Sequence, residues 1–327
     1  MKVGVNYAWK NYGCDFGVPP VRDAGSIWCQ RAAWQATIDE ELADFKRLGF
    51  FAVRWFVLGD GFALGNGQSV PHRDAGGVWR MSSLPPLSPE FLSDFRLLLD
   101  RFRAAGMMMM PVLVDFDMCK DGIEIAGMSR YLKQGRADVI RDPVIRSHLF
   151  SGVLSPLLEL SASYRDVIYA WELMNEPEWC TGPNRPVPLD AMEEFIREGI
   201  GRINAAGFLS TVGFAHYDAL AKWGSAALGV TLHQFHYYAE PSVLPAFEFD
   251  PRWPVIVGEI ASAVHRPWPE LASDQDLFSR LTHISKLKYP AAFIWASNHL
   301  NDTETPTAVD WGDNTRQAIT RFTTRLV

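Results

Sequence analysis

Two carboxylates that end apolar segments are the residues of this chain best placed to do chemistry. The first apolar run, 167–171, is followed by the pair Asn175-Glu176, and the second, 254–258, leads directly to Glu259. Both patterns are typical of buried strands that end in polar residues. Two carboxyl groups brought together at strand ends are what hydrolysis of a glycosidic bond requires, one as proton donor and the other as nucleophile.

The length and charge of the chain limit the alternatives. Its 327 residues suit one large domain or two small ones, and a (β/α)₈ barrel of this size is common. The formal net charge of −7 argues against a nucleic-acid partner, because phosphate binding favours a basic surface. No apolar segment has the length and freedom from charge of a membrane span, so no membrane association is expected.

The N-terminal segment and the cysteines bear on the cellular compartment. Residues 1–6 enter a strand-like pattern with no charged and apolar leader before it, which favours the cytoplasm, or secretion if a leader has been removed. The four cysteines contain no CxxC pair, so free thiols are expected and a zinc ribbon is not. A bridge between Cys14 and Cys29 stays open for an oxidising compartment.

Strand-like runs alternate with amphipathic helical stretches along the chain. Several of these runs are almost continuously apolar, as expected for strands that are covered on both faces. The predicted strands are Lys2–Trp9, Phe51–Leu58, Met107–Phe116, Val167–Asn175, Leu209–Ala215, Val230–Tyr238, Pro254–Ala261 and Ala291–Asn298.

Helices are predicted between the strands from hydrophobic spacing and end signals. Ser88 followed by Pro89 and Glu90 is a good helix start, and Gly106 is a helix stop. Eight strand-then-helix units predict an α/β fold, a (β/α)₈ TIM barrel that forms a single domain over residues 1–327. The predicted helices cover 34–48, 88–105, 142–164, 189–206, 270–288 and 313–324, with a weak one over 217–224.

Polar and aromatic residues occupy the predicted C-terminal ends of these strands, where barrel enzymes place their functional groups. This set resembles glycoside hydrolase family 5 and its wider clan of retaining β-glycosidases, and the resemblance extends from Asn6 to Trp311. One position departs from it, because the third strand ends near Asp115, where family 5 usually has a histidine. The matching residues are, in chain order, Arg54, Asn175, Glu176, His236, Tyr238, Glu259 and Trp295.

The resemblance implies roles for the two carboxyls and their neighbours. Glu259 is expected to attack the anomeric carbon, and Glu176 to protonate the leaving oxygen and then to activate water. Arg54 is expected to lower the pKa of Glu259 and keep it charged, and Tyr238 to donate a hydrogen bond to it. The pKa of Glu176 is expected to be raised in the resting enzyme.

Further substrate contacts are expected around the two carboxyls. Asn175 is expected to bond the sugar 2-hydroxyl, a contact that strengthens in the transition state. The chain has 12 tryptophans, and several lie in or beside predicted βα-loops, where indole faces can stack on sugar C–H faces. The other expected substrate-binding residues are His236, Trp295, Asp115, Trp9 and Trp179.

No metal and no cofactor are expected. His233 and His236 form an H-x-x-H pair, but three residues apart on a strand they point to opposite faces, so His233 is expected to pack behind the sheet. Asp115 and Asp117 share a face, but no histidine is close to them in the sequence. The expected partner is a carbohydrate.

The segment 170–177 carries the indication of substrate. Its Trp-Glu-Leu-x-Asn-Glu-Pro pattern resembles the β-mannanase branch of family 5 more than the cellulase branch, which favours a β-1,4-linked mannan or glucan. One alternative is a non-catalytic carbohydrate-binding barrel, which the intact Glu176 and Glu259 disfavour. Another is a transglycosylase, in which a sugar hydroxyl replaces water. The sequence leaves the oligomeric state and endo or exo action open.

Overall fold

The computed structural model describes residues 1–8, 15–17, 31–59, 71–73, 79–81, 84, 86–120, 123–124, 132–133, 135–238, 244, 254–261, 277–295 and 313–326. Trp9, Cys14 and Cys29 lie outside these described residues. The expected sugar contact of Trp9 and the open question of a Cys14–Cys29 bridge therefore stay expectations.

Eight parallel strands close into a barrel in the order β1-β12-β11-β10-β9-β8-β5-β2. Each barrel strand pairs with the one before it along the chain, and β12 pairs with β1 to close the ring. This confirms the predicted (β/α)₈ TIM barrel, with every predicted strand present. The barrel strands are β1 Lys2–Asn6, β2 Ala52–Phe56, β5 Met108–Asp115, β8 Trp171–Asn175, β9 Ser210–Phe214, β10 His233–Tyr237, β11 Val255–Ala261 and β12 Ala291–Trp295.

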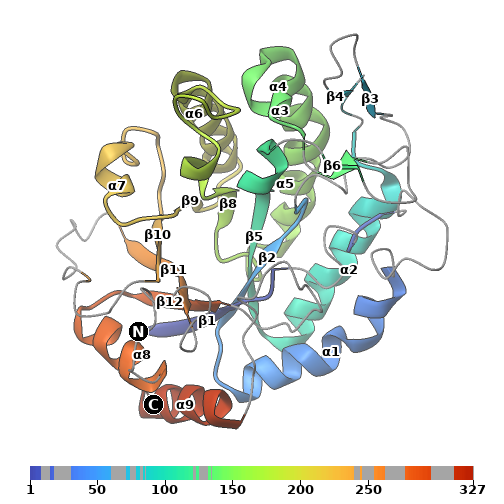
Figure 1. Cartoon of the computed structure of the whole chain (residues 1–327). Helices are drawn as coiled ribbons and strands as arrows, with labels where there is room; N and C mark the ends of the chain where they lie inside the picture. Colours follow the sequence, from blue (N-terminus) through green and yellow to red (C-terminus); the bar gives the residue numbers. More distant parts are fainter. Residues whose placement is uncertain are drawn as a thin grey trace.

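Helices follow the strands and surround the barrel, with α8 and α9 packed beside each other near the two chain ends (Figure 1). Two short antiparallel hairpins are added at the barrel rim, β3–β4 after β2 and β6–β7 after β5. The helices are α1 Arg31–Arg47, α2 Pro89–Ala105, α3 Asp138–Arg141, α4 Pro143–Leu149, α5 Ser155–Ser161, α6 Leu189–Ala205, α7 Ala219–Lys222, α8 Leu277–Lys286 and α9 Asp313–Thr323. The hairpin strands are β3 Pro71–Arg73, β4 Trp79–Met81, β6 Ile123–Glu124 and β7 Leu132–Lys133.

In the part of the chain that the structure describes, every helix is too short or too polar to cross a membrane.

Helix α2 begins and ends at the residues that its sequence predicts. The side chain of Ser88 accepts a hydrogen bond of 3.1 Å from the Phe91 amide, so it caps one of the free N–H groups of the first turn. Gly106 ends the helix with φ 63° and ψ 38°, a left-handed conformation that costs glycine little. These two signals set the length of the helix that packs against the β2–β5 side of the barrel.

The helix predicted over 142–164 is divided into two. A π-helical turn, η4 Phe150–Leu154, separates α4 from α5, and a short 3₁₀ turn, η5 Ala162–Tyr164, follows α5. Pro156 near the start of α5 has no amide hydrogen to donate, so the regular ladder cannot continue through it. The Ser155 amide donates to the Phe150 carbonyl instead, which widens the turn.

An apolar layer fills the barrel interior toward the N-terminal ends of the strands. Met108 and Met110 belong to this layer or pack on it, whereas Met107 and Met109 belong to the larger cluster shared with the helices. The side chains of this methionine run therefore alternate between the helix-facing side and the interior of the barrel. The fully buried members of the interior layer are Ala52, Met110, Ala170, Leu232, Ile256, Ala291 and Phe293.

A register shift in β11 turns Glu259 into the barrel. Ile256 belongs to the interior layer, so strict alternation along the strand would place Glu259 on the helix side. The pairing of β11 with β12 shifts between Val257 and Ile260, which adds one residue to β11 and re-aims its side chains. A similar shift between β8 and β9 precedes Asn175.

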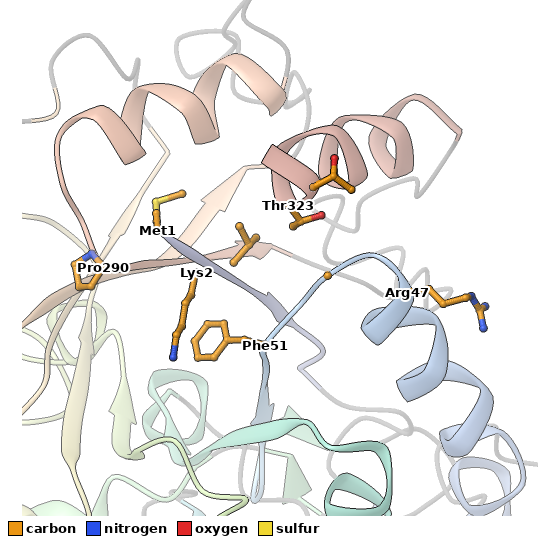
Figure 2. Close-up of a pocket in the computed structure, with 9 residues that line it drawn as sticks. Met1, Lys2, Arg47, Phe51, Pro290 and Thr323 are labelled. Atoms are coloured by element: carbon orange, nitrogen blue, oxygen red, sulfur yellow. The ribbon is translucent and has the colours of Figure 1, made fainter. Parts of the chain in front are cut away.

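A cavity of about 530 Å³ opens at the N-terminal ends of the strands (Figure 2). Lys2 and Phe51 line it together, with the Lys2 ammonium 5.3 Å from the centroid of the Phe51 ring. Thr323 on α9 and Pro290 before β12 complete part of its wall. The residues expected to do chemistry lie at the opposite ends of these strands, so this cavity is separate from them.

Candidate active site

Arg54 is the centre of a group of polar side chains above the apolar layer. It is fully buried, and its Nη1 donates to Asn6 Oδ1 at 2.8 Å and to Glu259 Oε1 at 2.6 Å. Its Nη2 donates to Asn175 Oδ1 at 2.7 Å. Burial alone lowers the pKa of Arg54, but the charges of Glu172 and Glu259 outweigh burial and raise it. The guanidinium is therefore a fixed positive charge that ties its own strand, β2, to β1, β8 and β11.

Glu172 holds the remaining donors of Arg54. Its Oε2 accepts from Arg54 Nε at 2.7 Å and its Oε1 from Nη2 at 2.6 Å, so the two groups meet as a fork. Gln234 on β10 donates from Nε2 to Glu172 Oε2 at 2.9 Å. All three side chains are fully buried. They form a polar layer between the apolar layer and the end of the barrel.

Asn175 is held at both ends of its amide. Its Oδ1 accepts from Arg54, and its Nδ2 donates to Asp115 Oδ2 at 2.8 Å. Asp115 also accepts the Asp117 amide at 2.7 Å through Oδ1. Burial, and next the charge of Asp117, raise the pKa of Asp115 well above its ordinary value. Asp115 thus lies at the site, and its described contacts orient Asn175.

Glu176 follows β8 in a strained backbone conformation. Its φ of 46° and ψ of 56° are left-handed, which costs a non-glycine residue about 1–3 kcal/mol. Its amide donates to the Gly213 carbonyl at 2.6 Å, and its carbonyl accepts from the Trp179 amide at 3.2 Å in the turn η6 Pro177–Trp179. Burial raises the pKa of Glu176 to about 7, and the charge of Arg54 offsets only part of that effect.

Glu259 receives a donor on each carboxyl oxygen. Arg54 Nη1 reaches Oε1 at 2.6 Å, and the Tyr238 hydroxyl donates to Oε2 at 2.5 Å, as the sequence predicted. Burial raises the pKa of Glu259, while His236 and Arg54 act in the opposite direction. The expected lowering by Arg54 is present, but it is smaller than the effect of burial. Burial and the charge of Glu259 together raise the pKa of Tyr238 well above its ordinary value.

His236 lies between the two carboxyls. Its Nδ1 is 2.7 Å from Glu176 Oε1 and 3.4 Å from Glu259 Oε2. Burial lowers the pKa of His236 to about 4, although the charge of Glu259 opposes this shift. The imidazole is therefore neutral near pH 7, and it can exchange a hydrogen bond with Glu176 without adding a charge.

Three atoms of this group have the spacing of metal ligands. One donor atom each from Glu176, His236 and Glu259 lies within 4.8 Å of the other two. Arg54, however, donates to the same Glu259 carboxylate and would repel a cation placed there. Two carboxyls with different surroundings and a neutral histidine are better suited to proton transfer and covalent chemistry than to binding a metal ion.

Two tryptophans lie at the rim of this group. Trp295 ends β12, and its half-buried ring makes an edge contact with Phe56, with ring centroids 6.3 Å apart. Trp179 is 42% exposed, and its ring centroid is 5.8 Å from that of His216, just beyond β9. The Trp179 indole also lowers the pKa of Glu176 through a hydrogen bond. Trp179 thus contacts one of the two carboxyls, and Trp295 pairs with Ala261 of β11, two residues beyond Glu259.

Glu178 places a further carboxyl next to the site. Its Oε1 accepts the Ala215 amide at 3.0 Å, which ties the turn η6 to the end of β9. Burial raises the pKa of Glu178 to about 7. The described residues provide no hydrogen-bond partner for its Oε2.

Residues outside this group behave as structural ones. His233 Nδ1 is 2.7 Å from Ser225 Oγ on the far side of β10 from His236, in agreement with the expected place behind the sheet. Cys119 and Cys180 are buried free thiols, as expected for these two cysteines. They lie in η3 Phe116–Cys119 and just after η6, the turns that follow β5 and β8.

The fold is shared with solved β-mannanases. A β-mannanase from the blue mussel Mytilus edulis has a TM-score of 0.67 and 18% identity, over 99% of this chain and 92% of that one. An endo-1,4-β-mannanase from Eisenia fetida has a TM-score of 0.68 and 18% identity, over 98% and 90%. The Pseudomonas stutzeri endoglucanase Cel5A has a TM-score of 0.57 and 12% identity, over 98% and 93%. No family model and no curated protein matches the sequence.

The structure adds functional candidates that the sequence did not single out. Glu172, Gln234 and Asn6 contact Arg54 or its partner, although each lies inside a run that resembles an ordinary buried strand. The available signal was the buried polar residue itself, because such residues need partners inside a barrel. Glu178 was missed because its position two residues after Glu176 resembles a solvated turn.

Proposed function

We propose that this chain is a retaining β-glycoside hydrolase of the family 5 type, with residues 1–327 acting as a single catalytic domain. The observation that carries the proposal is that a carboxyl oxygen of Glu176 and one of Glu259 lie within 4.8 Å of each other. Retaining enzymes hold their two carboxyls about 5 Å apart, whereas inverting enzymes leave about 6.5–9.5 Å for a water molecule.

The proposed nucleophile is Glu259. Arg54 and Tyr238 each donate to one of its oxygens, and both contacts favour the ionised carboxylate. Glu176 has no ion pair with Arg54 among its described contacts, so Glu259 is the carboxyl that ionises first. Attack of its oxygen on the anomeric carbon expels the leaving oxygen and gives a glycosyl ester.

The proposed acid and base is Glu176. Because burial raises its pKa to about 7, it holds a proton under conditions in which Glu259 is ionised. It donates that proton to the leaving oxygen. Once Glu259 is esterified its charge is gone, which lowers the pKa of Glu176 and allows it to accept a proton from the attacking water.

The neighbouring side chains supply the proposed substrate contacts. Asn175 has a second Nδ2 hydrogen beyond the one given to Asp115, and this hydrogen is available to the sugar 2-hydroxyl. Trp295, at the end of the strand next to β11, would offer an apolar platform on the Glu259 side, and the exposed ring of Trp179 one on the Glu176 side. These two rings would lie on the two sides of the bond that is cleaved.

The proposed substrate is a β-1,4-linked mannan or glucan, or oligosaccharides derived from them. The solved structures that share the fold include proteins described as β-mannanases and as an endoglucanase. The Trp-Glu-Leu-x-Asn-Glu-Pro segment favours mannan. Product analysis over a panel of β-linked mannans, glucans and their oligosaccharides would identify the sugar and distinguish endo from exo action.

Covalent labelling tests the mechanism. Incubation with activated 2-deoxy-2-fluoro mannosides and glucosides is expected to add one sugar to Glu259, located by peptide mass spectrometry. The Glu259→Ala variant is the matched control and should be neither labelled nor active. Label on another residue, together with full activity of Glu259→Ala, contradicts the proposal.

The same panel separates the alternatives. Binding of oligosaccharides without product would identify a non-catalytic carbohydrate-binding barrel. Products longer than the substrate would identify transglycosylation, in which a sugar hydroxyl replaces water in the second step. Proton NMR of the first product reports retention or inversion at the anomeric carbon directly.

A further inference from the structure

Glu172 is the carboxyl of the barrel interior that the proposed mechanism does not use. It lies two residues beyond Ala170 of the apolar layer and is fully buried. Both of its oxygens face Arg54, at 2.6 and 2.7 Å, and Gln234 donates to one of them. Glu259 contacts the same guanidinium through Nη1. Arg54 therefore stands between Glu172 and the proposed nucleophile.

The backbone around Glu172 leaves room for this arrangement. A Cβ on Gly213 of β9 would lie 2.4 Å from Glu172 Oε1 and 2.8 Å from Gln234 Nε2. A Cβ on Gly258 of β11 would lie 2.6 Å from Gln234 Cγ and Cδ. Glycines on the two strands that flank Gln234 thus provide the space that the buried acid and amide occupy.

Stability does not require a buried ion pair at this depth. Removing two charges from water costs several kcal/mol per ion, and apolar residues of similar volume often serve the fold as well or better. The layer directly below Glu172 in the barrel consists of apolar residues. The presence of Glu172 is better explained by what its position and charge do to the groups above it.

The charge of Glu172 acts on groups that it does not touch. It raises the pKa of Glu176 and that of His236, in addition to the effects of burial on both groups. The net charge of the cluster formed by Arg54, Glu172 and Glu259 explains this effect on the two pKa values. With Glu172 ionised, Arg54 is shared between two carboxylates and the cluster is negative, whereas without it Arg54 and Glu259 cancel.

We propose that Glu172 is a positioning residue of the glycosidase reaction, which fixes the Arg54 guanidinium against Glu259 and supplies the negative charge beneath the two catalytic carboxyls. This inference rests on the proposed roles of Glu176 and Glu259. Gln234 supports this role of Glu172, because its amide holds one Glu172 oxygen in place.

Two substitutions separate the charge of Glu172 from its geometry. Glu172→Gln keeps the shape and removes the charge, so we expect the basic limb of the pH profile of kcat/KM to move to lower pH by about half a unit or more. Glu172→Asp keeps the charge but is too short to reach Arg54 as a fork. It is expected to lower kcat at least about ten-fold, with KM and the basic limb nearly unchanged.

Asp94 of α2 provides the matched control. It is also a buried carboxyl, and its Oδ2 accepts the Gly17 amide at 2.9 Å. Asp94→Asn is expected to lower the melting temperature without moving the pH profile. If Glu172→Gln does not fold, the kcat and pH profile of Glu172→Asp still decide the case.

The outcomes distinguish this inference from the proposed function. A wild-type protein that is active and labelled at Glu259, with folded Glu172 variants of unchanged kcat and pH profile, overturns the inference alone. A wild type that neither hydrolyses the panel nor is labelled overturns both. A displaced basic limb in Glu172→Gln and a lowered kcat in Glu172→Asp support the inference.

Discussion

The Asn175 amide donates to Asp115 across 2.8 Å, from the end of β8 to the end of β5. At its other end the same amide accepts from Arg54 at 2.7 Å. Exchanging its oxygen and nitrogen would place its NH₂ group against an N–H group of Arg54 and its oxygen against an oxygen of Asp115. The orientation of Asn175 is therefore determined by its neighbours. At the position where family 5 usually has a histidine, this chain has an acceptor for Asn175.

Removing Asp115 should weaken catalysis through Asn175. Asp115→Ala frees the amide to rotate, and the lost hydrogen bond to a sugar 2-hydroxyl is worth about 1.5–3 kcal/mol, a ten- to hundred-fold loss in kcat/KM. The penalty should nearly vanish on a 2-deoxy substrate, which has no hydroxyl to bond. Steady-state kinetics on the matched pair of substrates measures both effects.

Asp117→Ala is the control for this experiment. The Asp117 side chain pairs with Lys120 at 2.5 Å near the surface, and only its backbone amide contacts Asp115. This variant should keep the wild-type preference for the 2-hydroxyl. An equal loss of activity on both substrates in Asp115→Ala would mean that Asp115 acts on the fold and not on Asn175.

The two carboxyls predict a bell-shaped pH profile for kcat/KM. Glu176 must carry a proton, and with a pKa of about 7 it loses that proton as the pH rises, so activity should fall above about pH 7. Glu259 must be ionised, and its raised pKa places the acidic limb above the ordinary carboxyl value. With an aryl glycoside that needs no acid, Glu176→Gln should lose the basic limb and keep the acidic one. A basic limb that survives in this variant assigns it to another group.

Glu178 predicts a pH dependence of stability. Its pKa is about 7 in the folded protein against an ordinary 4.5, so the folded state binds more protons than the unfolded state between these values. The free energy of unfolding therefore falls as the pH rises from 4.5 to 7, by up to about 3 kcal/mol, and this contribution is constant above pH 7. Glu178→Gln removes that dependence, since the amide does not titrate.

Denaturant unfolding at pH 5 and pH 8 measures this difference. The stability of Glu178→Gln relative to the wild type should be greater at pH 8 than at pH 5. Glu159→Gln, an exposed position on α5, serves as the control and should show no such change. Parallel pH dependence in all three proteins would show that Glu178 titrates normally.

The strand ends could be predicted from the sequence because a period of two and a run of apolar residues identify buried parallel strands. Arg54, Glu176, His236 and Glu259 follow from that assignment, and all four meet in the structure. The inward direction of Glu259 could not be predicted, because it depends on a register shift between paired strands. An unbroken period starting from Ile256 places it on the wrong face.

The polar layer of Arg54, Glu172 and Gln234 could not be predicted from the sequence, for a different reason. Glu172 and Gln234 occupy inward positions that apolar residues usually fill, and only the closed barrel brings them to Arg54. Their partners lie on strands far apart in the sequence, 118 residues away for Glu172 and Arg54. Sequence spacing within one strand carries no information about such a contact.

The glycine at position 213 offers a test of how tightly this layer is packed. A Cβ there would lie 2.4 Å from Glu172 Oε1 and 3.0 Å from His236 Nε2, so Gly213→Ala must displace one of these side chains. Pulling Glu172 away from Arg54 leaves a buried charge without its full pairing, which costs about 3–5 kcal/mol. We expect a variant that is less stable by about that amount and has a lowered kcat.

Gly201 on α6 provides the matched substitution, because no atom lies within 4 Å of a Cβ built there. Gly201→Ala should raise the free energy of unfolding by about 0.5–1 kcal/mol, since alanine loses less backbone entropy than glycine in a helix. Urea titration of both variants compares a clash in the polar layer with an open helical site. Wild-type stability and kcat in Gly213→Ala would mean that Glu172 can move without loss, and its fork with Arg54 would then not be what holds Glu259 in place.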